Sequence, residues 1–167
     1  MIGQSGAGKS TLAAAIGAGL DLPVTHLDQL RHLPGTQWEL RPDDEFAALH
    51  ANAVCVDRWV IEGNYSLLWT ERFERASGLI LLDLSTPRSL VEYLRRTGGR
   101  GPRIGGLDGT TDVLSRQMVA FIVRRTRANR RRRRDLFDSV DLPKLLLSGR
   151  PALRDFYEQE GLRRPLG

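Results

Sequence analysis

Gly3-Gln4-Ser5-Gly6-Ala7-Gly8-Lys9-Ser10 fits the phosphate-binding pattern G-x-x-x-x-G-K-[ST]. Its glycines allow backbone conformations that a Cβ would obstruct, so the amides of the loop can point inward around a phosphate. The alanine-rich residues 11–16 follow at once and predict a helix whose positive end faces the ligand. The pattern therefore predicts a nucleoside triphosphate site made by Gly3, Ser5, Gly6, Ala7, Gly8, Lys9, Ser10 and Thr11.

Two side chains of this loop carry its expected chemistry. Lys9 would reach the β- and γ-phosphates of the nucleotide, and the Ser10 hydroxyl would hold Mg²⁺. The alternative is a glycine-rich turn with no ligand, and the helix-forming run behind it favours the ligand site. Such a loop normally follows a buried strand of about five residues, whereas only Met1 and Ile2 precede Gly3. We therefore expect either a start a few residues upstream or a shortened central strand.

Length and composition indicate one domain over residues 1–167. We expect this domain to be cytoplasmic, monomeric or homodimeric, and without a membrane partner. No apolar run approaches the length of a membrane span, and the N-terminus does not resemble a signal peptide. The single cysteine, Cys55, excludes an internal disulfide and suits a reducing compartment. Because Cys55 lies in an apolar stretch, we expect it to be a small core residue.

The charge of the chain is unevenly distributed. Residues 1–84 carry a net charge of −5 and residues 85–167 one of +10. Eight arginines lie among residues 124–134, and residues 130–134 form a continuous run of which most should be solvated. A basic half of this kind can face polyphosphate or nucleic acid, so charge alone does not separate the two.

Strand-like and helix-like segments alternate along the chain, which indicates an α/β fold with a doubly wound parallel sheet. Strands are predicted at residues 23–28, 59–65, 78–84 and 145–148. Helices are predicted at residues 11–16, 42–54, 67–75, 87–98 and 151–160, and a long helix is predicted from about residue 112 to beyond residue 127. Gly17 and Gly19 should end the first helix, and residues 29–41 should be irregular.

Several of these stretches together resemble the adenylate-kinase-like family known as DNA topology modulation proteins. The resemblance runs from residue 1 to about residue 160, and its residues are Gly3–Ser10, His26–Asp28, Trp38, Glu62–Ser66, Arg72 and Leu82–Leu84. It implies a P-loop NTPase fold like that of nucleoside monophosphate kinases, with five parallel strands in the order 2-3-1-4-5 flanked by helices. It also implies an acceptor-binding insert at about residues 29–57, a small lid at about 97–112, and ATP and Mg²⁺ as ligands.

The resemblance also implies roles for acidic residues at strand ends. Glu62 resembles the carboxylate that holds a metal-bound water beside the loop; the alternative is a surface salt bridge. Asp28 is placed to accept the proton of an attacking hydroxyl or to bind the acceptor, and the alternative is a helix N-cap. Asp83 looks superficially like the metal-site carboxylate, and we rank it after Glu62. His26 is expected to be an ordinary strand side chain rather than a metal ligand.

Aromatic, amide and arginine side chains complete the candidate site. Trp38, Asn64 and Tyr65 are candidates for acceptor binding, with Trp69 as a further stacking candidate and core packing as the alternative for each aromatic. Arg72 matches the family's arginine after the Gly-Asn-Tyr stretch and is our candidate for an anion contact on the acceptor side. Candidate arginines for the transferring phosphoryl group are Arg100 and Arg103 in the expected lid, and Arg124, Arg127 and Arg131 at helical spacing.

Two functional hypotheses follow. The first is ATP- and Mg²⁺-dependent phosphoryl transfer to a nucleotide or other small acceptor. Its expected catalytic residues are Lys9, Asp28, Glu62, Arg100, Arg103, Arg124 and Arg127. The second is a nucleic-acid-binding protein in which ATP acts as a switch and residues 124–134 contact DNA phosphates. No DNA-reading motif accompanies the arginines, and aromatics are not interleaved with them, so the pattern favours the kinase.

Overall fold

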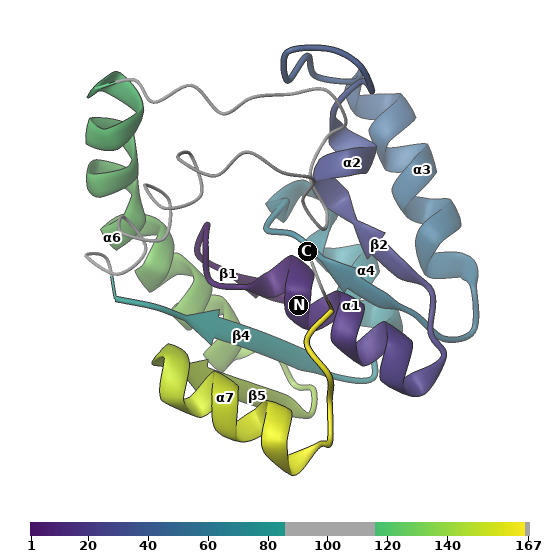
Figure 1. The fold of residues 1–167 in the computed structure, drawn as a ribbon. Coiled ribbons are helices and arrows are strands. Elements are labelled where there is room, and N and C mark those ends of the chain that lie inside the picture. Colours follow the sequence, from purple (N-terminus) through teal and green to yellow (C-terminus); the bar gives the residue numbers. More distant parts are fainter. Residues whose placement is uncertain (86–115, 166–167) are drawn as a thin grey trace.

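A computed structural model describes the backbone of residues 1–85 and 116–165, and the side chains of residues 1–85 and 128–165. The helix expected from Pro87 and the lid expected at 97–112, with Arg100 and Arg103, lie outside the described residues. Over the described part, strands and helices alternate and the strands pair in parallel, as expected for an α/β protein (Figure 1).

The elements have the following bounds in chain order. They are β1 (Ile2–Gly3), α1 (Lys9–Leu20), β2 (Val24–His26), α2 (Leu27–Arg31), α3 (Asp43–Cys55), β3 (Val60–Glu62), the 3₁₀ helix η1 (Ser66–Leu68), α4 (Trp69–Arg75), β4 (Leu79–Asp83), α6 (Arg116–Ser139), β5 (Lys144–Ser148) and α7 (Gly149–Gln159).

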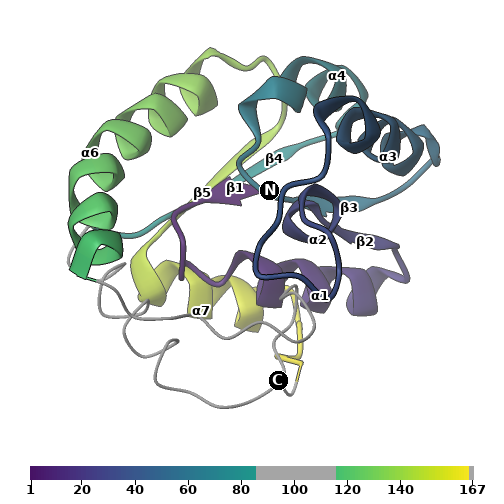
Figure 2. The same cartoon turned by 90° about the horizontal axis from the view of Figure 1, so that it is seen from above.

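The strands form two small parallel sheets. One sheet has the order β1-β4-β5, and the other pairs β2 with β3, with His26 opposite Glu62. The Gly63 amide donates a 3.1 Å hydrogen bond to the Met1 carbonyl, so the end of β3 is bonded to the start of the β1 segment. Viewed from above, β2 and β3 lie beside β1 on the side away from β5 (Figure 2). The carboxyl ends of β1 and β3 are therefore neighbours.

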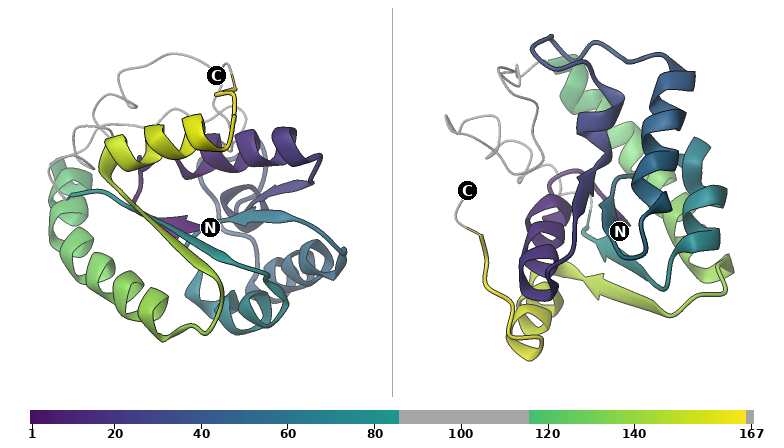
Figure 3. Two further views of the ribbon diagram at one scale, coloured as in Figure 1. Left: turned by 90° about the horizontal axis from the view of Figure 1, so that it is seen from below. Right: turned by 90° about the vertical axis from the view of Figure 1, so that its right-hand side faces the viewer.

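Helices cover both faces of the larger sheet, as the near-continuous apolar run of β4 requires. Side chains of β4 alternate between the faces, with Leu82 packing on the side of α1 and α7 and with Leu79 and Leu81 on the side of α6. Figure 3 shows α1 and α7 along one face and α6 with α4 along the other. A third cluster, made by Leu27, Val54 and Ile61, packs α2 and α3 against β3.

Three local predictions were wrong. Helix α1 runs through Gly17 and Gly19 to Leu20. The glycine at position 17 serves packing rather than helix termination, since a Cβ there would lie 2.2 Å from Val24 Cγ2 in β2. Cys55 is exposed at the end of α3, since the helical repeat turns Phe46, His50 and Val54 inward instead. The segment 29–41 begins inside a helix, α2, rather than as irregular chain.

Candidate functional site

The loop between β1 and α1 has the backbone geometry of an anion site. Gly6 and Gly8 have φ values of 74° and 90°, which favour glycine, and Gly8 is the N-cap of α1. As a glycine, this N-cap has no side chain that could bond to the helix. The amides of the first turn have no intrahelical acceptor and no bond from the Gly8 side, and they can bind phosphate oxygens.

Lys9 lies at the start of this helix, between the loop and a pocket. Its ammonium donates a 3.2 Å hydrogen bond to the Gln4 carbonyl, so the side chain folds back over the loop. The bond is to a neutral acceptor, and a phosphate oxygen would attract the ammonium more strongly. The geometry suits a lysine that holds a polyphosphate.

Glu62 is the centre of the acidic part of the site. The side chain of Glu62 is 3% exposed, its Oε1 accepts a 2.8 Å hydrogen bond from the Ser10 hydroxyl, and His26 Nδ1 lies 2.9 Å from the same oxygen. Burial alone would raise the pKa of Glu62, but the His26 hydrogen bond, the Lys9 charge and the Ser10 hydrogen bond together lower that pKa to about 2. Glu62 is therefore ionised at neutral pH beside the loop.

This low pKa makes the fold sensitive to acid. A carboxylate whose pKa is about 2 in the folded state and 4.5 in the unfolded state adds stability above pH 4.5 that is lost as the pH falls toward 2. We expect the free energy of unfolding, measured by urea denaturation, to lose up to about 3 kcal/mol from this source. The Glu62→Gln variant should show a correspondingly shallower decline between pH 5 and pH 3. Parallel declines for the variant and the wild type would contradict this assignment.

His26 is a neighbour of Glu62 that sequence reasoning missed. It was expected to be an ordinary strand residue, and it does lie in β2, but its ring is bonded to Glu62. The two residues face each other because β2 and β3 pair in parallel with His26 opposite Glu62. The sequence could have indicated this contact, because His26 and Glu62 each stand at the end of a short strand, and the ends of neighbouring parallel strands lie together.

Asn64 connects the end of β3 to β1 through two hydrogen bonds. The Gly3 amide donates to Asn64 Oδ1 at 3.0 Å, and Asn64 Nδ2 donates to the Gly3 carbonyl at 2.8 Å. The side-chain amide thus pairs with one residue of the loop as a neighbouring strand would. Asn64 was predicted to bind the acceptor; it does line the pocket described next, but its amide bonds hold the site together.

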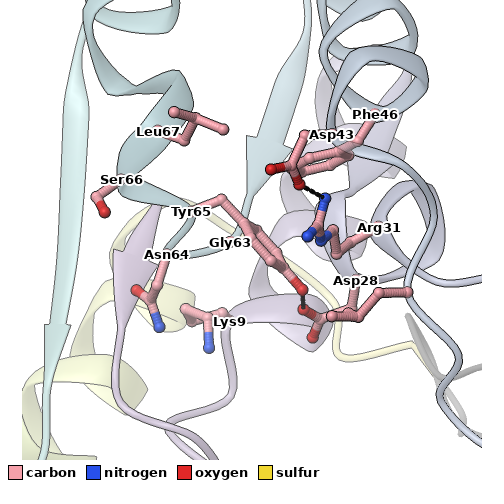
Figure 4. Close-up of a pocket in the computed structure, with 11 residues that line it drawn as sticks. Lys9, Asp28, Arg31, Asp43, Phe46, Gly63, Asn64, Tyr65, Ser66 and Leu67 are labelled. Carbon is pink, nitrogen blue, oxygen red and sulfur yellow. Dashed lines mark hydrogen bonds and ion pairs between the residues drawn. The ribbon is translucent and has the colours of Figure 1, made fainter.

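A pocket of about 640 Å³ opens beside Lys9 (Figure 4). It lies between α2, the start of α3 and the segment that follows β3. The described residues lining it are Lys9, Asp28, Arg31, Leu40, Asp43, Phe46, Gly63, Asn64, Tyr65, Ser66 and Leu67. This volume is in the range of small-molecule binding sites. The pocket therefore joins the predicted phosphate loop to part of the predicted acceptor insert.

Asp28 and Tyr65 meet inside this pocket. The Tyr65 hydroxyl donates a 2.6 Å hydrogen bond to Asp28 Oδ1 (Figure 4). Burial and the negative charge of Asp28 raise the pKa of Tyr65 well above its usual value, so the phenol stays protonated and donates. Asp28 lies in the first turn of α2, whose N-cap is His26, so the N-cap alternative for Asp28 was wrong.

Arg31, Asp43 and Phe46 are pocket residues that were not predicted. Arg31 Nη1 lies 2.6 Å from Asp43 Oδ1, and the Arg31 guanidinium lies 5.2 Å from the centroid of the Phe46 ring. Arg31 follows Asp28 by three residues, which places both on one face of α2 once that segment is known to be helical. The prediction of irregular chain at residues 29–41 hid this relation.

Trp38 and Arg72 do not line the pocket. Trp38 is 37% exposed and contacts His32 edge to face at 5.0 Å. Arg72 is 1% exposed, and burial lowers its pKa to about 10. Helix α4 turns this side chain into the protein, where its guanidinium nitrogens have no hydrogen-bond partner among the described residues, and the anion contact by Arg72 stays a prediction. Trp69 stacks with Phe73 at 6.3 Å, as the packing alternative for that aromatic implied.

Asp83 belongs to a charged cluster on the other side of the loop. Its carboxylate accepts hydrogen bonds from Arg130 Nε at 2.6 Å, from Arg134 Nε at 2.9 Å and from Gln4 Nε2 at 2.8 Å. Gln4 also exchanges hydrogen bonds with the backbone of Leu84. Burial opposes ionisation, but the bonds from Arg130, Gln4 and Arg134 outweigh it and hold the pKa of Asp83 far below its usual value. Asp83 is thus paired with two arginines, and its rank below Glu62 as a metal carboxylate stays a prediction.

The arginines at residues 130–134 make more contacts within the protein than expected. Arg133 is buried, Arg132 lies over the Trp69 ring at 5.8 Å, and Arg130 and Arg134 bind Asp83. Only Arg131 is almost fully solvated, with 87% of its side chain exposed and Asp135 at 3.9 Å. Most of the run was predicted to be solvated, and Arg130, Arg131, Arg132 and Arg134 are indeed exposed or partly exposed. The prediction did not foresee that Arg130 and Arg134 also bind Asp83 where α6 packs on β4. Arg124 and Arg127 lie in α6, and their side chains are outside the described ones.

No family model, curated protein or solved structure matches this chain. Among the described side chains, those of residues 1–85 and 128–165, no group of three or more His, Cys, Asp or Glu is arranged to hold a metal ion. In the same part of the chain, every helix is too short or too polar to span a bilayer.

Proposed function

We propose that this chain is an ATP- and Mg²⁺-dependent kinase that transfers a phosphoryl group to a small acceptor. The observation that carries the proposal is the contact between the Ser10 hydroxyl and the ionised Glu62 carboxylate, beside Lys9, which also lines a pocket of about 640 Å³. A loop for a polyphosphate, a hydroxyl–carboxylate pair for a hard cation and a pocket for a second molecule adjoin one another. Phosphoryl transfer needs this juxtaposition and little covalent help from the protein.

The residues fit Mg²⁺ when its other ligands come from phosphate and water. Mg²⁺ prefers oxygen ligands, keeps several waters and is commonly bound through one or two protein oxygens plus substrate phosphates. Ser10 Oγ and Glu62 are the oxygens that would hold it, directly or through water. The ion would neutralise charge on the phosphates, while Lys9 and the loop amides orient them.

The P-loop fold with five strands in the order 2-3-1-4-5 is part of this proposal. The Gly63–Met1 backbone hydrogen bond and the paired amide of Asn64 with Gly3 support it, because they connect the smaller sheet to β1. In that order the loop after β1 would lie at the middle of the sheet, where ligands bind in open α/β folds. The family resemblance rests on the same residues.

The contacts of the described arginines favour the kinase over the nucleic-acid hypothesis. Phosphate-backbone binding needs cations that can leave water for phosphate. Arg130 and Arg134 are bound to a buried carboxylate, and Arg133 is buried. Of residues 130–134, this leaves chiefly Arg131 and Arg132 for an outside anion.

A thermal-shift titration with Mg²⁺ and ATP tests the proposal. Binding to the folded state alone adds about 2.7 kcal/mol of stability at a hundred times the Kd, which is about 5–10 °C in Tm for a chain of this size. The shift should shrink when EDTA removes Mg²⁺. A chain that shifts with a short DNA duplex at low salt, and with no nucleotide, would support the nucleic-acid hypothesis instead.

A further inference from the structure

The charges around the acceptor pocket identify the class of molecule it takes. Among the described lining residues the cations are Lys9 and Arg31, and the anions are Asp28 and Asp43. If Lys9 is used by the donor phosphates, as the proposed function requires, the other three charges of the described lining, those of Arg31, Asp28 and Asp43, sum to −1. This part of the pocket wall disfavours an acceptor that is itself an anion.

Arg31 is the residue that would otherwise recognise an anion, and Asp43 neutralises it. Arg31 Nη1 lies 2.6 Å from Asp43 Oδ1, the Arg31 side chain is 16% exposed and that of Asp43 is 72% exposed, and the guanidinium lies over the Phe46 ring. The pair is neutral as a whole, and the Asp43 carboxylate repels a phosphate that approaches Arg31, so the pair attracts a phosphate less than a free guanidinium would.

The remaining polar groups suit a hydroxyl compound. Asp28 is held by the Tyr65 phenol through Oδ1, and its carboxylate is an acceptor that can take a further hydrogen bond or a proton. Phe46, Leu40 and Leu67 supply apolar surface in the same pocket. Apolar faces with a carboxylate are the combination that binds sugars, nucleosides and amino alcohols through their carbon frames and hydroxyl groups.

We propose that the acceptor is an uncharged or cationic hydroxyl compound, and not a nucleotide, a sugar phosphate or a carboxylate. The inference rests on the proposed kinase function and narrows its substrate. In the transfer, the bond between the γ-phosphorus of ATP and the β–γ bridging oxygen breaks, and a bond from that phosphorus to the acceptor oxygen forms. The hydroxyl proton passes to Asp28, and the products are ADP and a phosphate monoester.

The test uses inorganic phosphate as a probe of the pocket's charge, with the donor subsite filled by Mg²⁺ and the non-hydrolysable analogue AMP-PNP. Calorimetric titration of phosphate should show no binding to the wild type. The Asp43→Asn variant keeps the shape of the side chain and releases Arg31, so it should bind phosphate about tenfold or more tightly than the wild type. Adding Arg31→Gln to that variant should abolish the gain.

Asp44→Asn is the matched control, because it removes the same charge from the same first turn of α3 and does not line the pocket. It should bind phosphate no better than the wild type. Phosphate binding by the wild type would overturn the inference. The inference would also be overturned if Asp43→Asn gained no phosphate binding although its melting temperature equals that of Asp44→Asn, which shows that it is folded.

The two proposals fail in different ways. If AMP-PNP does not bind, the kinase proposal fails, and the difference in phosphate binding between the wild type and Asp43→Asn without nucleotide still reports the charge of the pocket. If AMP-PNP binds and phosphate also binds the wild type, only the acceptor class is wrong.

Discussion

Replacement of Lys9 by alanine is expected to lower the rate of phosphoryl transfer from ATP by about 10²- to 10³-fold, a loss typical of removing one preorganised charge-stabilising group. The ammonium is the loop's one side-chain cation, and it sits between the glycines and the pocket. Its bond to the Gln4 carbonyl is replaceable by water, so the fold should survive with a loss of about 1 kcal/mol. ADP release in the presence of Mg²⁺ and an accepted hydroxyl compound measures the effect.

Arg154→Ala provides the control for a lost positive charge. Arg154 is exposed on α7 and pairs with the neighbouring Asp155, far in sequence from the loop and outside the pocket lining. Lys144 is unsuitable, because its ammonium binds three carbonyls at the end of α6. Activity retained in Lys9→Ala, with Arg154→Ala unchanged, would argue strongly against the kinase proposal.

Replacement of Asp83 by alanine should cost about 2–4 kcal/mol of the free energy of unfolding. The carboxylate is almost fully buried and is the common partner of Arg130, Arg134 and Gln4. Removing it leaves two guanidinium groups beside a buried strand with no counter-charge, a change that costs several kcal/mol in buried pairs. Because both arginine side chains are about 40% exposed, water offsets part of the loss. Urea denaturation at pH 7 measures it.

Asp135→Ala is the comparison for Asp83→Ala. Asp135 is an exposed carboxylate on the same helix as these arginines, and its pair with Arg131 is loose at 3.9 Å. Exposed pairs of this kind contribute little, so the variant should stay within about 0.5 kcal/mol of the wild type. Equal effects of the two substitutions would mean that the Asp83 cluster does not hold α6 on the sheet.

Sequence patterns predicted the parts of the fold and the site that depend on local order. The glycine loop with Lys9 and Ser10, the apolar run of β4 and the alternation of strands and helices are of this kind, and Glu62 was expected near Ser10 through a family resemblance. Helix boundaries were predicted less accurately where tertiary contacts determine them. The end of α1 is an example, because Gly17 lies in the helix where it packs on Val24.

Relations between distant residues could not be predicted from one sequence. The pairing of Arg31 with Asp43 depends on how α2 meets α3, and the binding of Arg130 and Arg134 to Asp83 depends on which face of α6 meets β4. A run of five arginines gives no sign of which members turn inward, because a helix points them in all directions.

The hydrogen bonds of Gln4 have an evolutionary consequence. The phosphate-binding pattern leaves the position after the first glycine open to any residue, yet in this protein Gln4 connects Asp83 and Leu84 to the loop. A change at Gln4 alone would leave part of the Asp83 carboxylate without a partner, and a change at Asp83 alone would leave two arginines unpaired. Substitutions at Gln4, Asp83 and Arg130 should therefore be correlated among descendants of this sequence. A change in the loop would then usually be accompanied by a change in α6.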